Sequence, residues 1–172
     1  MGLKLFVNSI LTHAEAIPVA GGTFHVDVWN NQAQFMRDQT IEAIPLPALF
    51  VEVLFSDGGH DAERMTARQV QVRLHIVMEK MNVEGYFGRN TDIYDYRDLV
   101  LQYFSKWHAS TAAYPYDFTP FQYTGEQPQY DHDNLYEYVL EFSTMFSQVL
   151  GNYQDINQTN GQITTITINK QP

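Results

Sequence analysis

The sequence contains no cysteine. This absence excludes a disulfide framework, a thiolate zinc site and a cysteine nucleophile. Basic residues are also scarce, because 10 Lys and Arg stand against 20 Asp and Glu, which gives a net charge of −10. A freely diffusing nucleic-acid-binding protein needs a basic surface, so the composition argues against that class.

Long hydrophobic runs are missing as well. No stretch approaches the ~18 consecutive apolar residues that a transmembrane helix requires, so we expect no contact with a membrane. The N-terminal segment has a single Lys4, and its short apolar stretch is interrupted by Asn8 and Ser9. We therefore expect a short helix here rather than a signal peptide. Five apolar residues share one face of this helix: Leu3, Phe6, Val7, Ile10 and Leu11.

The remaining composition is typical of a folded protein. The 172 residues are 44% hydrophobic and 14% aromatic, which is enough to bury a core. We expect one α+β domain over residues 1–150, followed by a C-terminal loop and strand extension over 151–172. Threonine and isoleucine dominate the stretch from Gln162 to Asn169, and their β-branched side chains favour a strand.

Alternation of polar and apolar residues marks the strands, most clearly over residues 70–76. Valine, leucine and isoleucine at the even positions there alternate with Gln71, Arg73 and His75. One face of this strand must be buried, and the other must be wet or in contact with a partner. Further strands are expected over residues 24–28, 48–55, 118–124 and 136–146. The polar residues 56–68 contain a Gly-Gly pair and are expected to form a long exposed loop.

A main helix is expected from Thr91-Asp92 to about His108. Thr91 can cap its start, and Asp92 suits the positive end of the helix dipole. Its apolar stripe consists of Ile93, Tyr96, Val100, Leu101, Phe104 and Trp107. The predicted fold is α+β, with an antiparallel or mixed sheet of about four to six strands, one main helix across it and a short N-terminal helix.

The sequence carries no motif for catalysis or cofactor binding. GxSxG, P-loop, GxGxxG and HExxH patterns are all absent. Glu137 and Glu141 share a face of an expected strand but lie about 13 Å apart, which is too far for a glycosidase pair. Together with Glu52, we interpret them as the polar side of the sheet. We therefore expect that the protein is not an enzyme and that it binds no cofactor.

Two short segments contain residue types that could bind a metal ion. The first includes Asp57, His60 and Asp61, and the second is Asp131-His132-Asp133. Neither has the full acidic pattern of a calcium loop, and both fit solvated turns. We expect no metal site in either.

The expected loop at 56–68 is the candidate contact surface. Arg64, Arg68 and Arg73 form a local basic cluster, which either meets an acidic partner or balances the neighbouring acidic residues. A long loop with mixed charges can reach an adjacent subunit and set its register. The candidate interface residues are Asp57, His60, Asp61, Glu63, Arg64, Met65, Arg68 and Arg73.

The sequence is also rich in tyrosine, with 11 residues. Many of them fall in expected loops or at helix edges, where amphipathic aromatic side chains are typical of contact surfaces. These tyrosines are Tyr86, Tyr94, Tyr114, Tyr116, Tyr123, Tyr130 and Tyr153.

The order of elements resembles a family of bacteriophage and prophage tail-terminator or head–tail joining proteins. The resemblance covers about residues 3–147. It is carried by VDVWNNQ (26–32), PLPALFVEV (45–53), VQVRLHIVME (70–79), DIYDYRDLVLQYFSKW (92–107) and DHDNLYEYVLEFSTMF (131–146). The resemblance implies a small mixed sheet flanked by helices, assembled as a ring that caps the tail tube and meets the neck.

The same resemblance implies the partners and the location of the protein. The partners are further copies of the chain in a ring, expected to be a hexamer, together with the tail tube protein and a neck or head-completion protein. The protein would be made in the cytoplasm of the bacterial host and end in the virion. DNA would only pass through, and the acidic composition fits a conduit that repels phosphate. Two alternatives remain open: a non-catalytic interaction protein with another role, and a small-molecule-binding or hydrolytic α+β domain.

Overall fold

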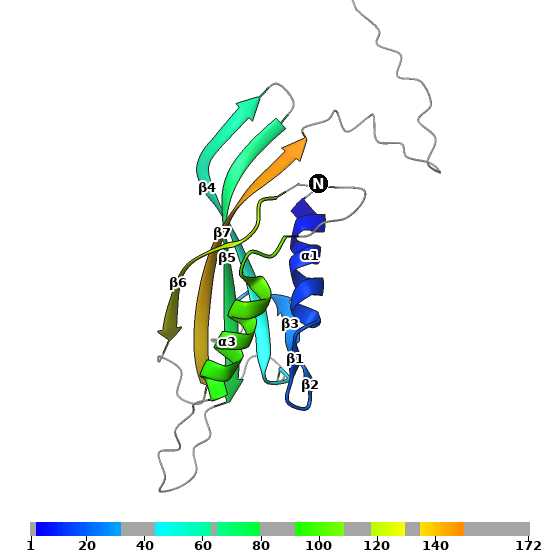
Figure 1. The fold of residues 1–172 in the computed structure, drawn as a ribbon, viewed down its shortest axis with the longest axis vertical. Helices are drawn as coiled ribbons and strands as arrows, with labels where there is room; N and C mark the ends of the chain where they lie inside the picture. The colour runs from blue at the N-terminus through cyan, green and yellow to red at the C-terminus, as the bar shows by residue number, and fades with distance from the viewer. Residues whose placement is uncertain are drawn as a thin grey trace, which may run out of the picture.

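The computed structural model describes residues 3–31, 44–62, 65–79, 92–108, 118–129 and 135–149. Over 56–62, 65–66 and 147–149 only the backbone is described. The described part contains a mixed five-stranded sheet with two helices on one side (Figure 1). This arrangement confirms the predicted α+β class.

The described residues form two helices and seven strands. The helices are α1 (Leu3–Glu15) and α3 (Asp92–Phe104). A small antiparallel pair is formed by β1 (Pro18–Val19) and β2 (Gly22–Thr23). The strands of the large sheet are β3 (His25–Val28), β4 (Ala48–Ala62), β5 (Met65–Glu79), β6 (Gln122–Gln129) and β7 (Leu135–Val149).

The large sheet has the strand order β3-β4-β5-β7-β6. β3 pairs parallel to β4, and the other neighbours are antiparallel. β5 lies at the centre, where its backbone pairs with β4 on one side and with β7 along its whole length on the other. The central strand β5 therefore sets which residues of β4 and β7 lie side by side.

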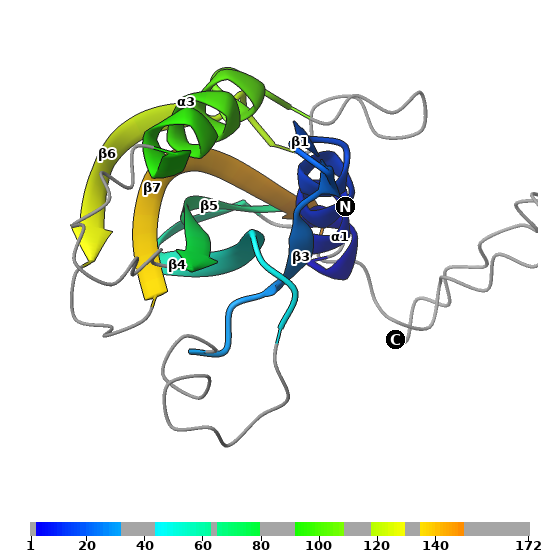
Figure 2. The ribbon, with the colours of Figure 1, turned by 90° about the horizontal axis from the view of Figure 1, so that it is seen from below.

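Both helices cover the same face of this sheet (Figures 1 and 2). The alternating residues of β5 turn their apolar side chains toward the helices, as the sequence predicts. Phe6 and Ile10 of α1 pack into the same core. Three residues of the predicted stripe of α3 are fully buried: Ile93, Val100 and Phe104. The main helix of the prediction is thus confirmed, with its last helical residue at Phe104.

His13 connects α1 to α3. Its Nε2 donates a hydrogen bond to the carbonyl oxygen of Tyr103 over 3.0 Å. Its ring stacks on Trp107 with the centroids 4.3 Å apart and 12° between the planes, and it meets Phe104 edge to face. Burial lowers the pKa of His13 below its ordinary 6.5, although the hydrogen bond to Tyr103 acts in the opposite direction.

This environment predicts a contribution of His13 to acid sensitivity. A ring with a lowered pKa in the folded state stabilises the fold above its unfolded pKa, and the contribution is lost as the pH falls through the folded value. We expect the melting temperature to fall between about pH 7.5 and about pH 5.5, and His13→Phe to make that fall smaller. His108→Phe, at an exposed position, is the matched control. An unchanged pH slope in His13→Phe would show that burial of this ring does not contribute.

The predicted loop at 56–68 is wrong. β4 continues to Ala62 and β5 begins at Met65, and they pair through positions such as Gly59–Arg68 and Asp61–Thr66. The register shifts between Phe55 and Gly59. The polar residues stay in strands here because β5 pairs with β7 as well as with β4, so backbone hydrogen bonds hold this part of β5 from two sides and β5 in turn pairs with β4.

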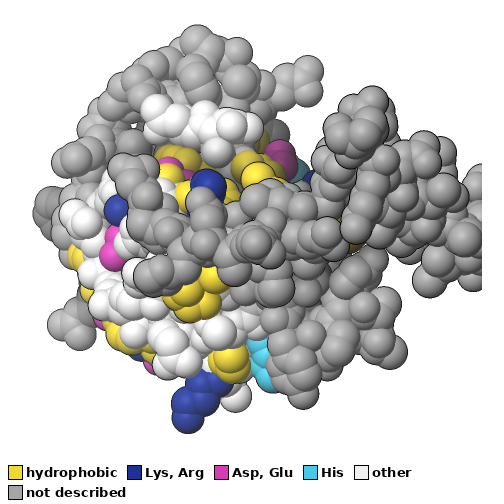
Figure 3. Space-filling model, turned by 90° about the horizontal axis from the view of Figure 1, so that it is seen from above, with side chains coloured by type: hydrophobic (Ala, Val, Ile, Leu, Met, Phe, Trp, Pro, Cys, Tyr) yellow, Lys and Arg dark blue, Asp and Glu magenta, His cyan; other side chains and the backbone are white. Residues whose placement is uncertain are grey.

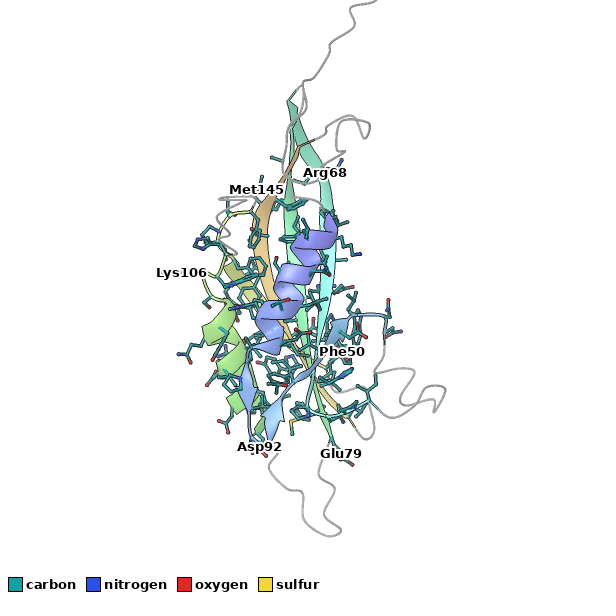
Figure 4. All side chains as sticks on the ribbon, turned by 90° about the vertical axis from the view of Figure 1, so that its right-hand side faces the viewer. Phe50, Arg68, Glu79, Asp92, Lys106 and Met145 are labelled. Atoms are coloured by element: carbon teal, nitrogen blue, oxygen red, sulfur yellow. The ribbon has the colours of Figure 1, made fainter. Side chains whose placement is uncertain are left out.

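The extended ends of the three strands form an arm. We define the arm as residues 56–62 of β4, 65–69 of β5 and 145–149 of β7. It projects beyond the helices at the top of the molecule (Figures 1 and 4). The described core ends at Val70 of β5 and Phe146 of β7, close to the base of the arm.

The strand predicted over 118–124 is shifted along the chain. β6 spans Gln122–Gln129, and Phe118 contributes only an isolated bridge to Phe146. Among the described strands β6 lies at the edge of the sheet, and edge strands are where a proline such as Pro128 is tolerated. The strand predicted over 162–169 and the whole extension 151–172 lie outside the described residues. Among the described helices, none is long and apolar enough to cross a membrane.

Candidate functional site

The sheet face opposite the helices, called the outer face here, carries a row of charged side chains. Arg73 of β5 lies directly between Glu52 of β4 and Glu141 of β7 in the strand register. Its Nε donates to Glu141 Oε1 over 3.0 Å, and its Nη1 reaches Glu52 Oε2 over 3.5 Å. Because all three side chains are partly exposed, these pairs contribute modestly to stability but link three strands.

A buried part of the same row surrounds His75. Its Nδ1 lies 2.7 Å from Glu137 Oε1, and its Nε2 lies 3.4 Å from Glu52 Oε2. The ring stacks on Trp29 with centroids 4.0 Å apart and 5° between the planes. Only 4% of His75 and 1% of Glu137 is exposed. The row therefore runs from the partly exposed side chain of Arg73 to the buried side chain of Glu137.

The burial of Glu137 corrects the interpretation of Glu52, Glu137 and Glu141 as simply the polar side of the sheet. A second small cluster of buried side chains lies on the outer face, against Trp29, Ile44 and Leu46. It consists of Ala48, Phe50, Val77 and Leu135. The segments before β4 and after β3 supply this cover, and such long-range packing leaves no periodic signal in the strand itself.

The row is a network of ion pairs and hydrogen bonds that joins three strands. Arg73 contacts the carboxylates of Glu52 and Glu141, and His75 contacts those of Glu52 and Glu137. Among the residues that the structure describes, no three His, Asp or Glu side chains are placed to hold a metal ion. The side chains of Asp57, His60 and Asp61 and the whole of Asp131–Asp133 lie outside the described residues.

Beside the charge row, the outer face has an open depression that spans four strands. It is lined by Leu54 and Phe55 of β4, Gln69–Gln71 of β5, Thr124 of β6, and Glu141 and Ser143 of β7. Four of the eight side chains, those of Gln69, Gln71, Thr124 and Ser143, end in amide or hydroxyl groups, which can donate and accept hydrogen bonds. The depression therefore offers hydrogen-bonding groups beside apolar side chains.

A second ionic cluster attaches the edge strand β6 to α3. Arg97 Nη2 and Nε lie 2.6 and 2.8 Å from Glu126 Oε2. Burial tends to raise the pKa of Glu126, but hydrogen bonds from Arg97, Tyr123 and Tyr138 together hold it below its ordinary value. Burial, and then the bond to Glu126, raise the pKa of Tyr138. This cluster supports the fold on the helix side.

The structure separates the basic residues that the sequence grouped. Arg68 and Arg73 lie five positions apart on a regular strand, so their side chains point to opposite faces. Arg68 is exposed at the base of the arm (Figure 4), on the helix side. Arg73 belongs to the charge row on the outer face. The predicted cluster of Arg64, Arg68 and Arg73 is therefore wrong as a single patch.

The other candidate interface residues fall in or beside the arm. Asp57, His60 and Asp61 lie on β4, and Met65 is the first residue of β5. Their side chains are outside the described set, as are Glu63 and Arg64 entirely. The candidate residues with a described backbone are thus gathered along the arm, except for Arg73.

Some exposed aromatic and apolar side chains fit the expected contact surfaces. Tyr94 is 47% exposed and Tyr123 is 43% exposed. Phe55 and Met145, at the base of the arm, are also exposed. The other tyrosines of the prediction lie outside the described residues.

Neither a protein-family model nor a curated protein matches this sequence. The function is therefore inferred from the fold, the arm and the charges of the chain.

Proposed function

We propose that this protein is a structural subunit of a bacteriophage or prophage tail or neck. Copies of the chain form a ring, expected to be a hexamer, which terminates the tail tube and joins it to the head. Its partners are the tail tube protein and a neck or head-completion protein, and its place is the virion. The role is structural, without a catalytic step.

The arm is the observation that carries this proposal. Three strands of 15 residues each extend past the helices, and the described core ends at the base of the arm. A narrow ribbon of two or three strands gains little stability by itself, so a projecting ribbon is suited to contacts with another subunit. Phe55 and Met145 add exposed apolar surface at its base.

The order of elements supports the same role. The segments that carry the resemblance coincide with β3, the start of β4, the second half of β5, α3 and most of β7. The resemblance implies a small mixed sheet flanked by helices, and the described sheet is mixed and carries two helices.

The charge distribution is compatible with passage of DNA. The net charge is −10, and the basic side chains visible on the described surface in Figure 3 are few and separate. A wall of this charge repels phosphate and does not retain a passing duplex.

Removal of the arm tests the role in assembly. Replacement of residues 57–67 by a short Gly-Ser linker is expected to leave a folded protein, because the core from Val70 onward keeps its contacts. Ring formation is expected to fail in light scattering and electron microscopy. Arg68→Glu reverses a single charge at the base of the arm and is expected to have the same effect on ring formation. Lys106→Glu, which changes the charge equally at another exposed position, is its control (Figure 4).

The expected pattern is loss of rings with the linker variant and with Arg68→Glu, and normal rings with Lys106→Glu. If the linker variant assembles and terminates tails as well as the parent, the arm is not an assembly element.

A further inference from the structure

The outer edge of β4 is uncovered along most of its length in the described part of the chain. β3 pairs with β4 only from Ala48 to Val51. From Glu52 to Ala62 no described strand lies beside the edge that faces away from β5. An unpaired edge of this length is a template for another strand.

The direction of the backbone groups along this edge follows from the parallel pairing with β3. His25 N donates to Pro47 O, and Trp29 N donates to Val51 O. Outward groups therefore belong to the odd-numbered residues of β4, and this alternation continues to Val53 and Phe55. The side chain of Phe55, at this stretch of the edge, is 38% exposed.

We propose that residues 162–169 of the same chain add to this edge as a sixth strand, antiparallel to β4. The segment QITTITIN is uncharged, contains three isoleucines and three threonines, and has no proline or glycine. These residues have the highest preference for strands. The direction follows because β7 runs parallel to β4, so a chain that leaves β7 at Val149 must turn back to lie along β4.

The connection over residues 150–161 is long enough for the segment to reach the outer edge of β4 in the same chain. β7 and β4 are separated only by β5, which places them about 10 Å apart. Residues 150–161 connect Val149 to the segment, and a flexible chain of that length spans about 20 Å on average and about 40 Å at most. Such a tether gives an effective concentration in the millimolar range. The chain's own segment is thereby favoured over that of a second copy.

The charges are compatible with this occupant. The part of β4 that it would cover contains Asp57 and Asp61, whereas the segment carries no acidic residue and is followed by Lys170. Covering the edge would also remove a site for uncontrolled strand pairing between copies.

Amide hydrogen exchange of the full chain and of a chain ending at residue 150 tests this proposal. The Phe55 amide faces the outer edge, and its protection is expected to fall at least about tenfold in the shortened chain. The Leu54 amide faces β5 and serves as an internal control that stays protected in both. Equal exchange of Phe55 in the two chains would overturn the proposal.

Proline variants give the same test in the full-length chain. Thr165→Pro combined with Ile166→Pro is expected to remove the protection of Phe55. In a strand, one of two consecutive N–H groups points toward β4, and the double change removes both groups. Asn157→Pro, in the connection, is the matched control and is expected to keep it. Protection that survives the double proline change would count against the segment as the occupant.

Disulfide trapping separates the chain's own segment from that of a second copy. Because the chain has no cysteine, Phe55→Cys can be combined with single cysteines scanned through residues 163–168. Oxidation is expected to link at least one pair within a single chain, which then migrates as a monomer without reductant. Links that form only between chains would overturn the assignment to the same chain, and so would the absence of any link across the scan.

Discussion

Replacing Phe104 with alanine is expected to lower the free energy of unfolding by about 3–5 kcal/mol. The side chain of Phe104 is completely buried. Its ring lies 4.9 Å from that of His13, 5.6 Å from Trp107, 6.0 Å from Phe121 and 6.1 Å from Phe142, measured between centroids. These rings come from α1, the residues just after α3, the segment before β6, and β7. They hold one another in place, so the cavity left by the substitution would collapse only in part.

Urea unfolding at neutral pH measures this effect. Gln102→Ala, at an exposed position of the same helix, is the control and is expected to change the free energy of unfolding by less than about 0.5 kcal/mol. Similar midpoints for Phe104→Ala and the parent would refute the packing of α3 on the sheet.

The second large effect is expected at the buried end of the charge row. His75→Leu is expected to cost about 3–5 kcal/mol, because it leaves the Glu137 carboxylate buried without its 2.7 Å partner. It also removes the ring that stacks on Trp29. Glu137→Leu is expected to be destabilising for the corresponding reason.

A double-mutant cycle distinguishes a paired network from two independent residues. His75→Leu combined with Glu137→Leu is expected to cost clearly less than the sum of the single changes, because either single change already removes the 2.7 Å contact between the two side chains. Arg73→Leu, in the partly exposed part of the row, is expected to lower the free energy of unfolding by no more than about 1 kcal/mol. Additive losses in the cycle would mean that the two side chains do not support each other.

The parts of the fold that sequence analysis predicts correctly are those with a local repeating signal. The alternation from Val70 to Ile76 identifies the buried face of β5, and the spacing from Ile93 to Phe104 identifies the buried face of α3. In both cases one side of a regular element packs against a continuous core, so the burial pattern repeats the period of the element.

The parts that sequence analysis misses depend on pairing between distant segments. The part of β4 in the arm contains Gly58, Gly59 and two aspartates, and it is a strand because β5 pairs with it and β7 pairs with β5. The parallel pairing of β3 with β4 joins segments separated by 19 residues, from Val28 to Ala48. No local pattern encodes either contact.

The candidate site shows the same division. Glu137 is buried on an outer face that Trp29, Ile44 and Leu46 partly cover from outside the strand. The sequence alone could predict that Arg68 and Arg73 lie on opposite faces if both are in one strand, because side chains an odd number of residues apart point to opposite sides. This separation became visible only once the strand was known to begin at Met65.

The most direct test of the ring is the mass of the purified full-length chain, alone and after mixing with tail tubes, together with electron micrographs. The proposed role predicts closed rings with a mass that is a whole multiple of 19.9 kDa. A hexamer would have about 120 kDa, and the rings would be seated at tube ends. A species of 19.9 kDa at every concentration, which neither forms rings nor binds tube ends, would contradict it.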